Sequence, residues 1–307
     1  MLDSLTERID AQQLKQGDPK ALAAMKRAAT DVGFAIVNNT DISAAEVSLA
    51  LHAYKEFFKM PVSGKEPFNM ARTGSNRGWG APKSEQVNSD ANADYKEFFD
   101  CGFTLPDNDP LSKKLCYSPN IWPTQPVAFQ SIIQQYYDKA IGVSHDILRG
   151  LALSIAQPSA HFDEAFKQPM ALLRGNFYPE RPKGATSKDF GIAAHTDYGC
   201  LTLLATDGSP GLEAKNRQGQ WIPIQAQPGE FIINFGEMMS FWTDGLVQAT
   251  LHRVSGTLHE RVSIPMFFNP SEETNVAPNG MDPIMAGAYL QRRYEETYVH
   301  LKNRSLK

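Results

Sequence analysis

Two residues of the chain have the types and the spacing of metal ligands. His195 and Asp197 stand on either side of a single threonine. In an extended segment, side chains two positions apart point to the same face, so the imidazole and the carboxylate would converge on one point. His-x-Asp alone also arises by chance, and a single histidine is more often a hydrogen-bonded or surface group than a ligand. The pair therefore needs a third ligand from elsewhere in the chain.

His252 is the candidate for that third ligand. It stands at the start of a predicted strand, far enough along the chain for the strand to fold back across a β-sandwich beside His195. Two histidines and one carboxylate on one face of a metal leave positions open for a chelating co-substrate and for O2. The three residues together predict a non-haem Fe(II) site.

Arg261 and Ser263 follow His252 on the next predicted strand. Their spacing of two again places both side chains on one face. A buried arginine needs an anion, and its planar fork matches a carboxylate with two hydrogen bonds. The pair therefore predicts a carboxylate site near the metal, although an arginine paired with a surface glutamate would read the same in isolation.

The elements that must position these groups change in character along the chain. The first third predicts helices around one short strand, with start signals at Asp18-Pro19 and in the capping-box spacing of Ser43 and Glu46. After Pro169, short β-branched and aromatic runs alternate with turns at the spacing of an all-β barrel or a jelly roll. We expect helices at 19–32, 43–60, 126–156 and 286–301, a long loop with one short strand at 62–94, and strands at 34–37, 171–178, 200–205, 211–214, 221–224, 231–235, 251–255 and 262–268.

Composition restricts the classes of protein to which the chain can belong. Its 307 residues are 42% hydrophobic, which is enough apolar material for a sizeable core. A net charge of -4 without a Lys/Arg-rich run argues against nucleic acid as a partner. We expect no membrane span and no secretory signal. Three widely spaced cysteines favour reduced thiols in a cytoplasmic protein, and the sequence leaves both a monomer and a homodimer open.

Taken in order, these motifs resemble the isopenicillin N synthase-like family of 2-oxoglutarate/Fe(II) oxygenases. The similar segments are His195-x-Asp197, His252, Arg261-x-Ser263, residues 176–179, 228–230 and 243–245, Gly33-Phe34, and residues 96–102. The chain departs from the family's usual turn at residues 38–40, and it has Gly236-Glu237 where Gly-Asp is typical. The resemblance implies an α+β fold, with a double-stranded β-helix (jelly-roll) core at 170–272 that is flanked by helices. It also implies one oxygenase domain over 1–307, with residues 1–125 as an N-terminal helical region on the substrate side.

The resemblance also implies a role for each residue of the site. His195, Asp197 and His252 would hold Fe(II). The distal carboxylate of 2-oxoglutarate would be bound by Arg261, Ser263 and Tyr178, and Asn176 would lie near this co-substrate. The implied activity is the oxidation of a small organic substrate with O2, by hydroxylation or a related C–H oxidation, with release of succinate and CO2.

The residues that would contact the substrate are less well marked. Phe267 shares the face of Arg261, and Arg174 shares the face of Tyr178. Arg174 would then meet a carboxylate on a small polar substrate. Further candidates are Tyr198, Phe98, Trp79 and Glu85, although core packing is the more common role of such aromatic side chains.

Four other functions fit part of the pattern. An oxidase of the same family could use Arg261 and Ser263 to hold a carboxylate other than that of 2-oxoglutarate, although Tyr178 with Asn176 favours 2-oxoglutarate. An ethylene-forming enzyme would break down 2-oxoglutarate itself. A non-catalytic binding protein on this scaffold would be expected to lose a ligand or the arginine, and all are present. A cupin-type jelly roll with another metal fits the order of the motifs poorly.

Overall fold

The computed structural model describes residues 6–106, 108–181, 183–186, 188–256, 259–278 and 280–305. Its strands are β1 (Glu7–Asp10), β2 (Phe34–Asn38), β3 (Gly78–Gly80), β4 (Glu97–Gly102), β5 (Leu172–Tyr178), β6 (Ile192–His195), β7 (Leu201–Thr206), β8 (Leu212–Lys215), β9 (Trp221–Pro223), β10 (Phe231–Phe235), β11 (His252–Val254) and β12 (Arg261–Phe268). Its helices are α1 (Ala11–Lys15), α2 (Pro19–Arg27), α3 (Ala44–Lys59), α4 (Val62–Lys65), α5 (Met70–Thr73), α6 (Phe129–Ser154), α7 (Glu237–Trp242), α8 (Ala286–Thr297) and α9 (Val299–Ser305). A π-helical turn (Ala28–Val32) continues α2. Within the described ranges, no helix combines the length and the apolar character of a membrane span.

Two β-sheets form the core of the fold. The major sheet has eight strands in the order β1-β2-β10-β7-β12-β5-β4-β3, and the minor sheet has four in the order β6-β11-β8-β9. Apolar side chains of both sheets meet in one buried cluster, in which Ile36 and Leu204 of the major sheet accompany Leu212 and Val254 of the minor sheet. The two sheets therefore face each other. The predicted α+β fold with a double-stranded β-helix core is confirmed.

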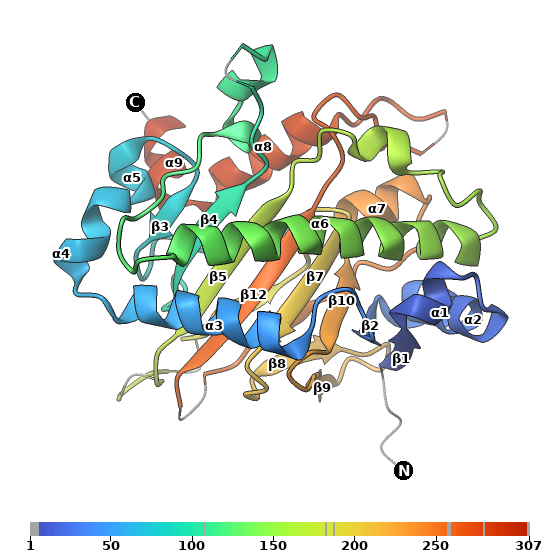
Figure 1. Ribbon diagram of the computed structural model, residues 1–307, viewed down its shortest axis with the longest axis horizontal. Helices are drawn as coiled ribbons and strands as arrows, with labels where there is room; N and C mark the ends of the chain where they lie inside the picture. The colour runs from blue at the N-terminus through green and yellow to red at the C-terminus, as the bar shows by residue number, and fades with distance from the viewer. Residues whose placement is uncertain are drawn as a thin grey trace.

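Helices α3 and α6 lie across the other face of the major sheet (Figure 1). One face of α6 buries Ile133, Tyr137 and Ala140, at the spacing of three to four residues that an amphipathic helix requires. The ring of Phe57 from α3 packs at centroid distances of 4.9 Å from Phe99 and 5.2 Å from Phe129. This aromatic packing gives the central strands a close-packed backing.

Local signals set the ends of the first helices, as the sequence predicted. The Asp18 carboxylate accepts from the backbone at the start of α2, and Ser43 forms a complete capping box with Glu46 at the start of α3. Gly33 ends the π-helical turn that continues α2, with a φ of 75°. A Cβ at Gly33 would lie 2.5 Å from the carbonyl oxygen of Gln248, so a larger residue would meet both strain and a clash.

The structure differs from the sequence prediction between residues 62 and 94. The predicted short strand is present as β3, but α4 and α5 form where a loop was expected. The helix α5 is set by caps, since the Asn69 side chain accepts from the Ala71 backbone and Gly74 ends the helix in the left-handed region. Helices of four residues are too short to show a hydrophobic period, which explains the error. Strands β1, β4 and β6 and helices α1 and α7 were also not predicted, and the last predicted helix is two helices, α8 and α9.

Strand pairing brings the motifs together from distant parts of the chain. Strand β11 runs antiparallel to β6 with His252 opposite His195. Strand β12 runs antiparallel to β5 with Arg261 opposite Tyr178. The minor sheet therefore carries the two histidines, while the major sheet carries the arginine.

Candidate active site

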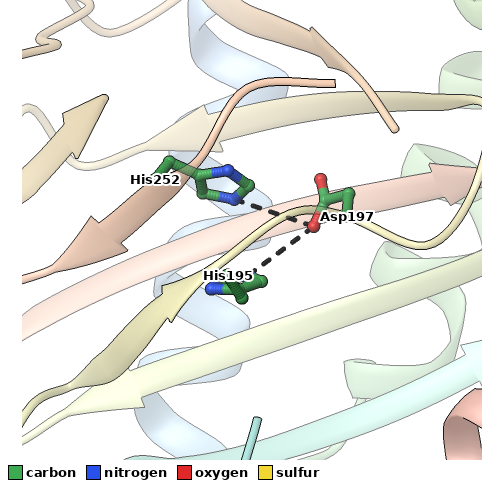
Figure 2. A group of neighbouring side chains, drawn as sticks. All are labelled: His195, Asp197 and His252. Atoms are coloured by element: carbon green, nitrogen blue, oxygen red, sulfur yellow. Dashed lines mark ion pairs between the residues drawn. The ribbon is translucent and has the colours of Figure 1, made fainter. Parts of the chain in front are cut away.

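His195, Asp197 and His252 form a three-residue cluster between the two sheets. One ligand atom from each residue lies within 4.8 Å of the others. The Nε2 atoms of both histidines lie 3.7 Å from Oδ1 of Asp197, toward which they point in Figure 2. Strand β6 ends at His195, so Asp197 lies just beyond the strand. The carboxylate nevertheless meets both imidazoles.

Hydrogen bonds behind the histidines leave the inner nitrogens free for a metal. Nδ1 of His195 lies 2.8 Å from the Ala193 carbonyl oxygen, and Nδ1 of His252 lies 3.0 Å from that of Thr250. Because a carbonyl can only accept, each Nδ1 must donate, and each Nε2 presents its lone pair to the centre. Burial and the neighbouring His252 lower the pKa of His195 to about 4, so this imidazole is neutral at pH 7.

Asp197 is held in its ionised form. Its Oδ2 accepts from the Thr202 hydroxyl at 2.5 Å and from the Asn234 amide at 2.6 Å. Burial acts to raise the pKa of Asp197, but the two histidines and these hydrogen bonds lower it overall. Two neutral imidazoles and one oriented carboxylate are the donor set and the protonation states that Fe(II) requires.

Arg261 forms an anion site beside this cluster. Its side chain is 2% exposed, and within the described part of the chain its Nε and Nη1 atoms have no hydrogen-bond partner. Oδ1 of Asn176, on the adjacent strand, also has no partner there, and Ser263 lies opposite Asn176. A buried cation without an anion is costly, so the two free nitrogens of Arg261 fit a carboxylate ligand.

A cavity of about 110 Å³ joins the metal cluster to the anion site. It is lined by all seven residues predicted for the metal and the co-substrate, namely Asn176, Tyr178, His195, Asp197, His252, Arg261 and Ser263. Apolar side chains from both sheets, Leu204 and Leu212 among them, complete its walls. Residues of α8 and Glu85 also line the cavity, and Glu85 forms a β-bridge with Tyr298, the residue after α8.

Comparison with known proteins assigns this arrangement to a family. The model of the 2OG-Fe(II) oxygenase superfamily matches residues 169–270, and that of the N-terminal region of the non-haem dioxygenases in morphine synthesis matches residues 7–125. A homoarginine-6-hydroxylase of Arabidopsis thaliana is 30% identical, with 85% of this chain and 80% of that protein covered. The chain belongs to the 2-oxoglutarate/Fe(II) oxygenase superfamily. The predicted resemblance to the isopenicillin N synthase-like enzymes, the enzyme class and the cofactors Fe(II), 2-oxoglutarate and O2 are thereby confirmed.

Other relatives of the oxygenase agree with this assignment. A 2-oxoglutarate-Fe(II) type oxidoreductase of Aspergillus fumigatus is 33% identical over 70% of this chain and 66% of that protein. A 2OG-Fe(II) oxygenase family protein from Caulobacter crescentus superposes with a TM-score of 0.83 at 25% identity, over 95% of this chain and 99% of that one. JOX2, solved with 2OG, Fe and JA, superposes with a TM-score of 0.78 at 26% identity, over 96% and 88% of the two chains. The oxygenase therefore oxidises a small molecule with 2-oxoglutarate as co-substrate.

The candidate substrate residues of the oxygenase divide into two groups. Phe267, Arg174, Tyr198 and Glu85 line the cavity. Trp79 and Phe98 do not line it, which corrects the prediction for these two side chains. Trp79 is buried in the core, where its Nε1 donates to Glu97 at 2.6 Å. The ring of Phe98 lies 3.9 Å from the Arg174 guanidinium carbon and supports that side chain.

Arg174 lines the cavity but has no free donor for a substrate carboxylate. Its Nε and Nη2 donate to the two oxygens of Asp100, both at 2.8 Å, and its Nη1 donates to Glu85 at 3.0 Å. Nη2 also donates to the Tyr298 hydroxyl at 2.5 Å. Because the planar guanidinium is already satisfied within the chain, the predicted contact with a substrate carboxylate would require one of these bonds to break.

Glu85 is the carboxylate bound to Arg174 that also lines the cavity. Burial acts to raise its pKa, but Arg174 and Lys96 lower it to about 2, so the carboxylate is ionised. Lys96 donates to Glu85 at 2.5 Å and to Asp94 at 3.0 Å. Three carboxylates, those of Glu85, Asp94 and Asp100, thus accompany the two cations.

Sequence reasoning missed several residues of the site. Thr202 and Asn234, which orient Asp197, stand within strands that are otherwise apolar, and a polar residue in such a run was the available signal. Leu290, Tyr294, Thr297 and Tyr298 line the cavity from the C-terminal helices and the link between them, and no local signal marks them.

Proposed function

We propose that the oxygenase hydroxylates a C–H bond of a small substrate held between the metal cluster and α8. His195, Asp197 and His252 hold Fe(II) in this proposal. Arg261, Ser263 and Tyr178 bind the distal carboxylate of 2-oxoglutarate, and Asn176 lies beside the co-substrate. The observation that carries the proposal is the buried guanidinium of Arg261, whose free donors face the cavity that also holds the three metal ligands.

Each residue would contribute orientation and not redox chemistry. Fe(II) with 2-oxoglutarate and O2 supplies the oxidising power, and succinate and CO2 are released. The two imidazoles and the carboxylate offer their donor atoms on one side only, which leaves the opposite side for co-substrate and O2. Arg261 fixes the far end of 2-oxoglutarate, while Leu204, Leu212 and Val254 exclude water from the space around it.

The charges at the cavity wall support a substrate that carries a cation. Glu85 is ionised, and of the three carboxylates in its network it is the one that lines the cavity. Arg174 and Arg261 are the cations of the described cavity lining, and both are engaged in this proposal. A substrate carboxylate would therefore meet neutral groups. The homoarginine-6-hydroxylases among the relatives are named for a guanidinium-bearing amino acid, which agrees with a cation facing Glu85.

A complete site within one chain supports either a monomer or a homodimer as the active form. Residues from 85 to 298 of the same chain line the cavity, in agreement with one catalytic domain over residues 1–307. Size-exclusion chromatography with light scattering would separate the two oligomeric states.

The three cysteines are unpaired and buried, which supports a reducing, cytoplasmic location.

The co-substrate assignment is tested without knowledge of the substrate. Apo-protein is loaded anaerobically with Fe(II), 2-oxoglutarate is added, and the visible charge-transfer band of an iron-bound keto acid is recorded. We expect the band in wild type and not in Asp197→Ala. In Arg261→Ala the band should need at least about thirtyfold more 2-oxoglutarate, since one partner of a buried ion pair is lost. Arg149→Ala, a surface arginine, is the matched control. Iron binding without a band in wild type would contradict 2-oxoglutarate as the ligand of Arg261.

The substrate class is tested by comparing two molecules of nearly equal shape. Homoarginine has a guanidinium where homocitrulline has a neutral urea. We expect the cationic molecule to stimulate 2-oxoglutarate turnover more strongly, and Glu85→Gln to remove that preference. Equal stimulation by both molecules in wild type would contradict a cation-selective pocket.

A further inference from the structure

Helix α8 is linked to the metal-binding loop, residues 196–199, on both sides of Asp197. Leu290, Tyr294 and Thr297 of this helix line the cavity, so α8 forms one wall of the space proposed for the substrate. Helices α7 and α8 both lie in the upper half of Figure 1, above the major sheet. Two separate links tie this wall to the residues that flank the metal ligand.

The first link passes through Glu237, the first residue of α7. Its Oε1 accepts from the hydroxyl of Thr196, which stands between His195 and Asp197, at 2.5 Å. Its Oε2 accepts from the hydroxyl of Tyr289 on α8. The Glu237 carboxylate thus bridges the metal-binding loop and α8, because one oxygen accepts from the loop and the other accepts from the helix.

The second link is made by the residue after Asp197. The hydroxyl of Tyr198 lies 2.7 Å from Oγ1 of Thr297. The guanidinium carbon of Arg293 lies 4.2 Å from the centre of the Tyr198 ring, and Nη2 of Arg293 lies 3.7 Å from Oε1 of Glu237. Arg293 therefore joins the two links from the side of α8.

The backbone of α7 anchors the loop independently of these side chains. The amide of Glu237 donates to the Asp197 carbonyl oxygen at 2.8 Å, and the amide of Met238 donates to that of Tyr198 at 3.2 Å. These backbone hydrogen bonds remain when the side-chain carboxylate of Glu237 is removed, so the loop stays anchored. The bridging function of that carboxylate can be changed without direct loss of a metal contact.

We propose that Glu237 is a positioning residue that fixes α8 against the metal-binding loop and so sets the distance between the substrate wall and the metal centre. Glu237 does not line the cavity, and its effect passes through Tyr289 and Thr196. The inference rests on the proposed use of the cavity as the substrate site. When α8 is released, water enters and the substrate is held less closely, so 2-oxoglutarate is consumed without matching oxidation of substrate.

Hydrogen exchange on the purified full-length protein tests the link directly. The variants are Tyr289→Phe, which removes only a hydroxyl, Glu237→Ala, and the double variant. Gln291→Ala, an exposed change on the same helix, is the control. We expect the amides of residues 286–297 to exchange about tenfold faster in each single variant, since a hydrogen bond to a charged group is lost. The double variant should exchange like Glu237→Ala alone, and the strands β7 and β10 should be unchanged.

A second readout separates positioning from a merely structural role. The charge-transfer band with Fe(II) and 2-oxoglutarate should form in Tyr289→Phe at the wild-type 2-oxoglutarate concentration. With ascorbate in the assay as the reductant that returns the iron to Fe(II), consumption of 2-oxoglutarate without added substrate should rise severalfold over wild type and over Gln291→Ala. Wild-type exchange of α8 in Tyr289→Phe, additive effects in the double variant, or unchanged substrate-free turnover would each overturn the proposal. A missing band in wild type would instead count against the proposed function.

Discussion

Replacing Arg174 with alanine should destabilise the fold far more than it changes any direct contact with substrate. Arg174 is 5% exposed, and its guanidinium donates to Asp100, Glu85 and Tyr298. The variant would leave Glu85, Asp94 and Asp100 buried with Lys96, which pairs with Glu85 and Asp94 and not with Asp100. Removing one partner of a buried ion pair costs about 3–5 kcal/mol, a large part of the ~5–15 kcal/mol that keeps a typical domain folded.

Arg149 provides a matched surface control for this change. It also binds an aspartate with two nitrogens, since its Nε and Nη2 lie 3.2 Å and 3.0 Å from Oδ2 of Asp163. Its side chain is 48% exposed, however, and that of Asp163 is 32% exposed. Surface pairs contribute about 0–1 kcal/mol, so Arg149→Ala should be nearly neutral. We expect calorimetry at pH 7 to give a Tm about 6–10 °C lower for Arg174→Ala and almost unchanged for Arg149→Ala.

The pH dependence of this difference has a defined sign. Burial raises the pKa of Asp100 in the wild-type protein, while Arg174 is the first of the groups that lower it. Without Arg174 that pKa rises further above its unfolded value. The ionised carboxylate then destabilises the fold at pH 7, and protonation relieves this as the pH falls. The Tm deficit of Arg174→Ala should therefore be smaller at pH 5 than at pH 7.

Two outcomes would refute this reasoning. A Tm deficit no larger than that of Arg149→Ala would show that the network around Arg174 does not hold a buried charge. A deficit that grows at pH 5 would show that the carboxylates are not the groups left unpaired. A stable variant with a raised KM alone would restore the prediction that Arg174 binds a substrate carboxylate.

Two further predictions concern the metal cluster. Asn234→Ala and Thr202→Val each remove a hydrogen bond to Oδ2 of Asp197. The Fe(II) affinity measured in an anaerobic titration should therefore fall by about 10–100-fold. An unchanged affinity would contradict the orienting role of these two side chains. Mn(II) at about a hundred times its Kd should raise the free energy of unfolding of wild type by about 2.7 kcal/mol, and EDTA should reverse the effect. Asp197→Ala should show no such rise, and a rise in that variant would place the metal elsewhere.

The chemistry of the site could be predicted from the sequence because it depends on local spacing. A separation of two residues places Arg261 and Ser263 on one face of a strand in any fold that keeps the strand extended. The same separation suggested the convergence of His195 and Asp197, although Asp197 lies just beyond the end of β6. Caps at Asp18 and elsewhere set helix ends for an equally local reason.

The partners of each charged group could not be predicted in this way. Arg174 binds Asp100 and Glu85, which lie 74 and 89 positions away in the chain. Periodicity indicates only the face to which a side chain points, and a free guanidinium and a satisfied one have the same periodicity. The prediction of a substrate carboxylate at Arg174 did not foresee these bonds, because the tertiary structure supplies both carboxylates from within the chain.

By itself, the sequence determined which residues are the candidate metal ligands, which arginine is the candidate for the anion site, and the alternation that makes a jelly roll. These follow from residue type and from the two-residue period of strands. Only the tertiary structure decided what surrounds them: the hydrogen bonds of Thr202 and Asn234 to the ligand carboxylate, and the approach of α8 to the metal-binding loop through Glu237. Contacts of this kind depend on how distant segments pack, which no spacing along the chain records.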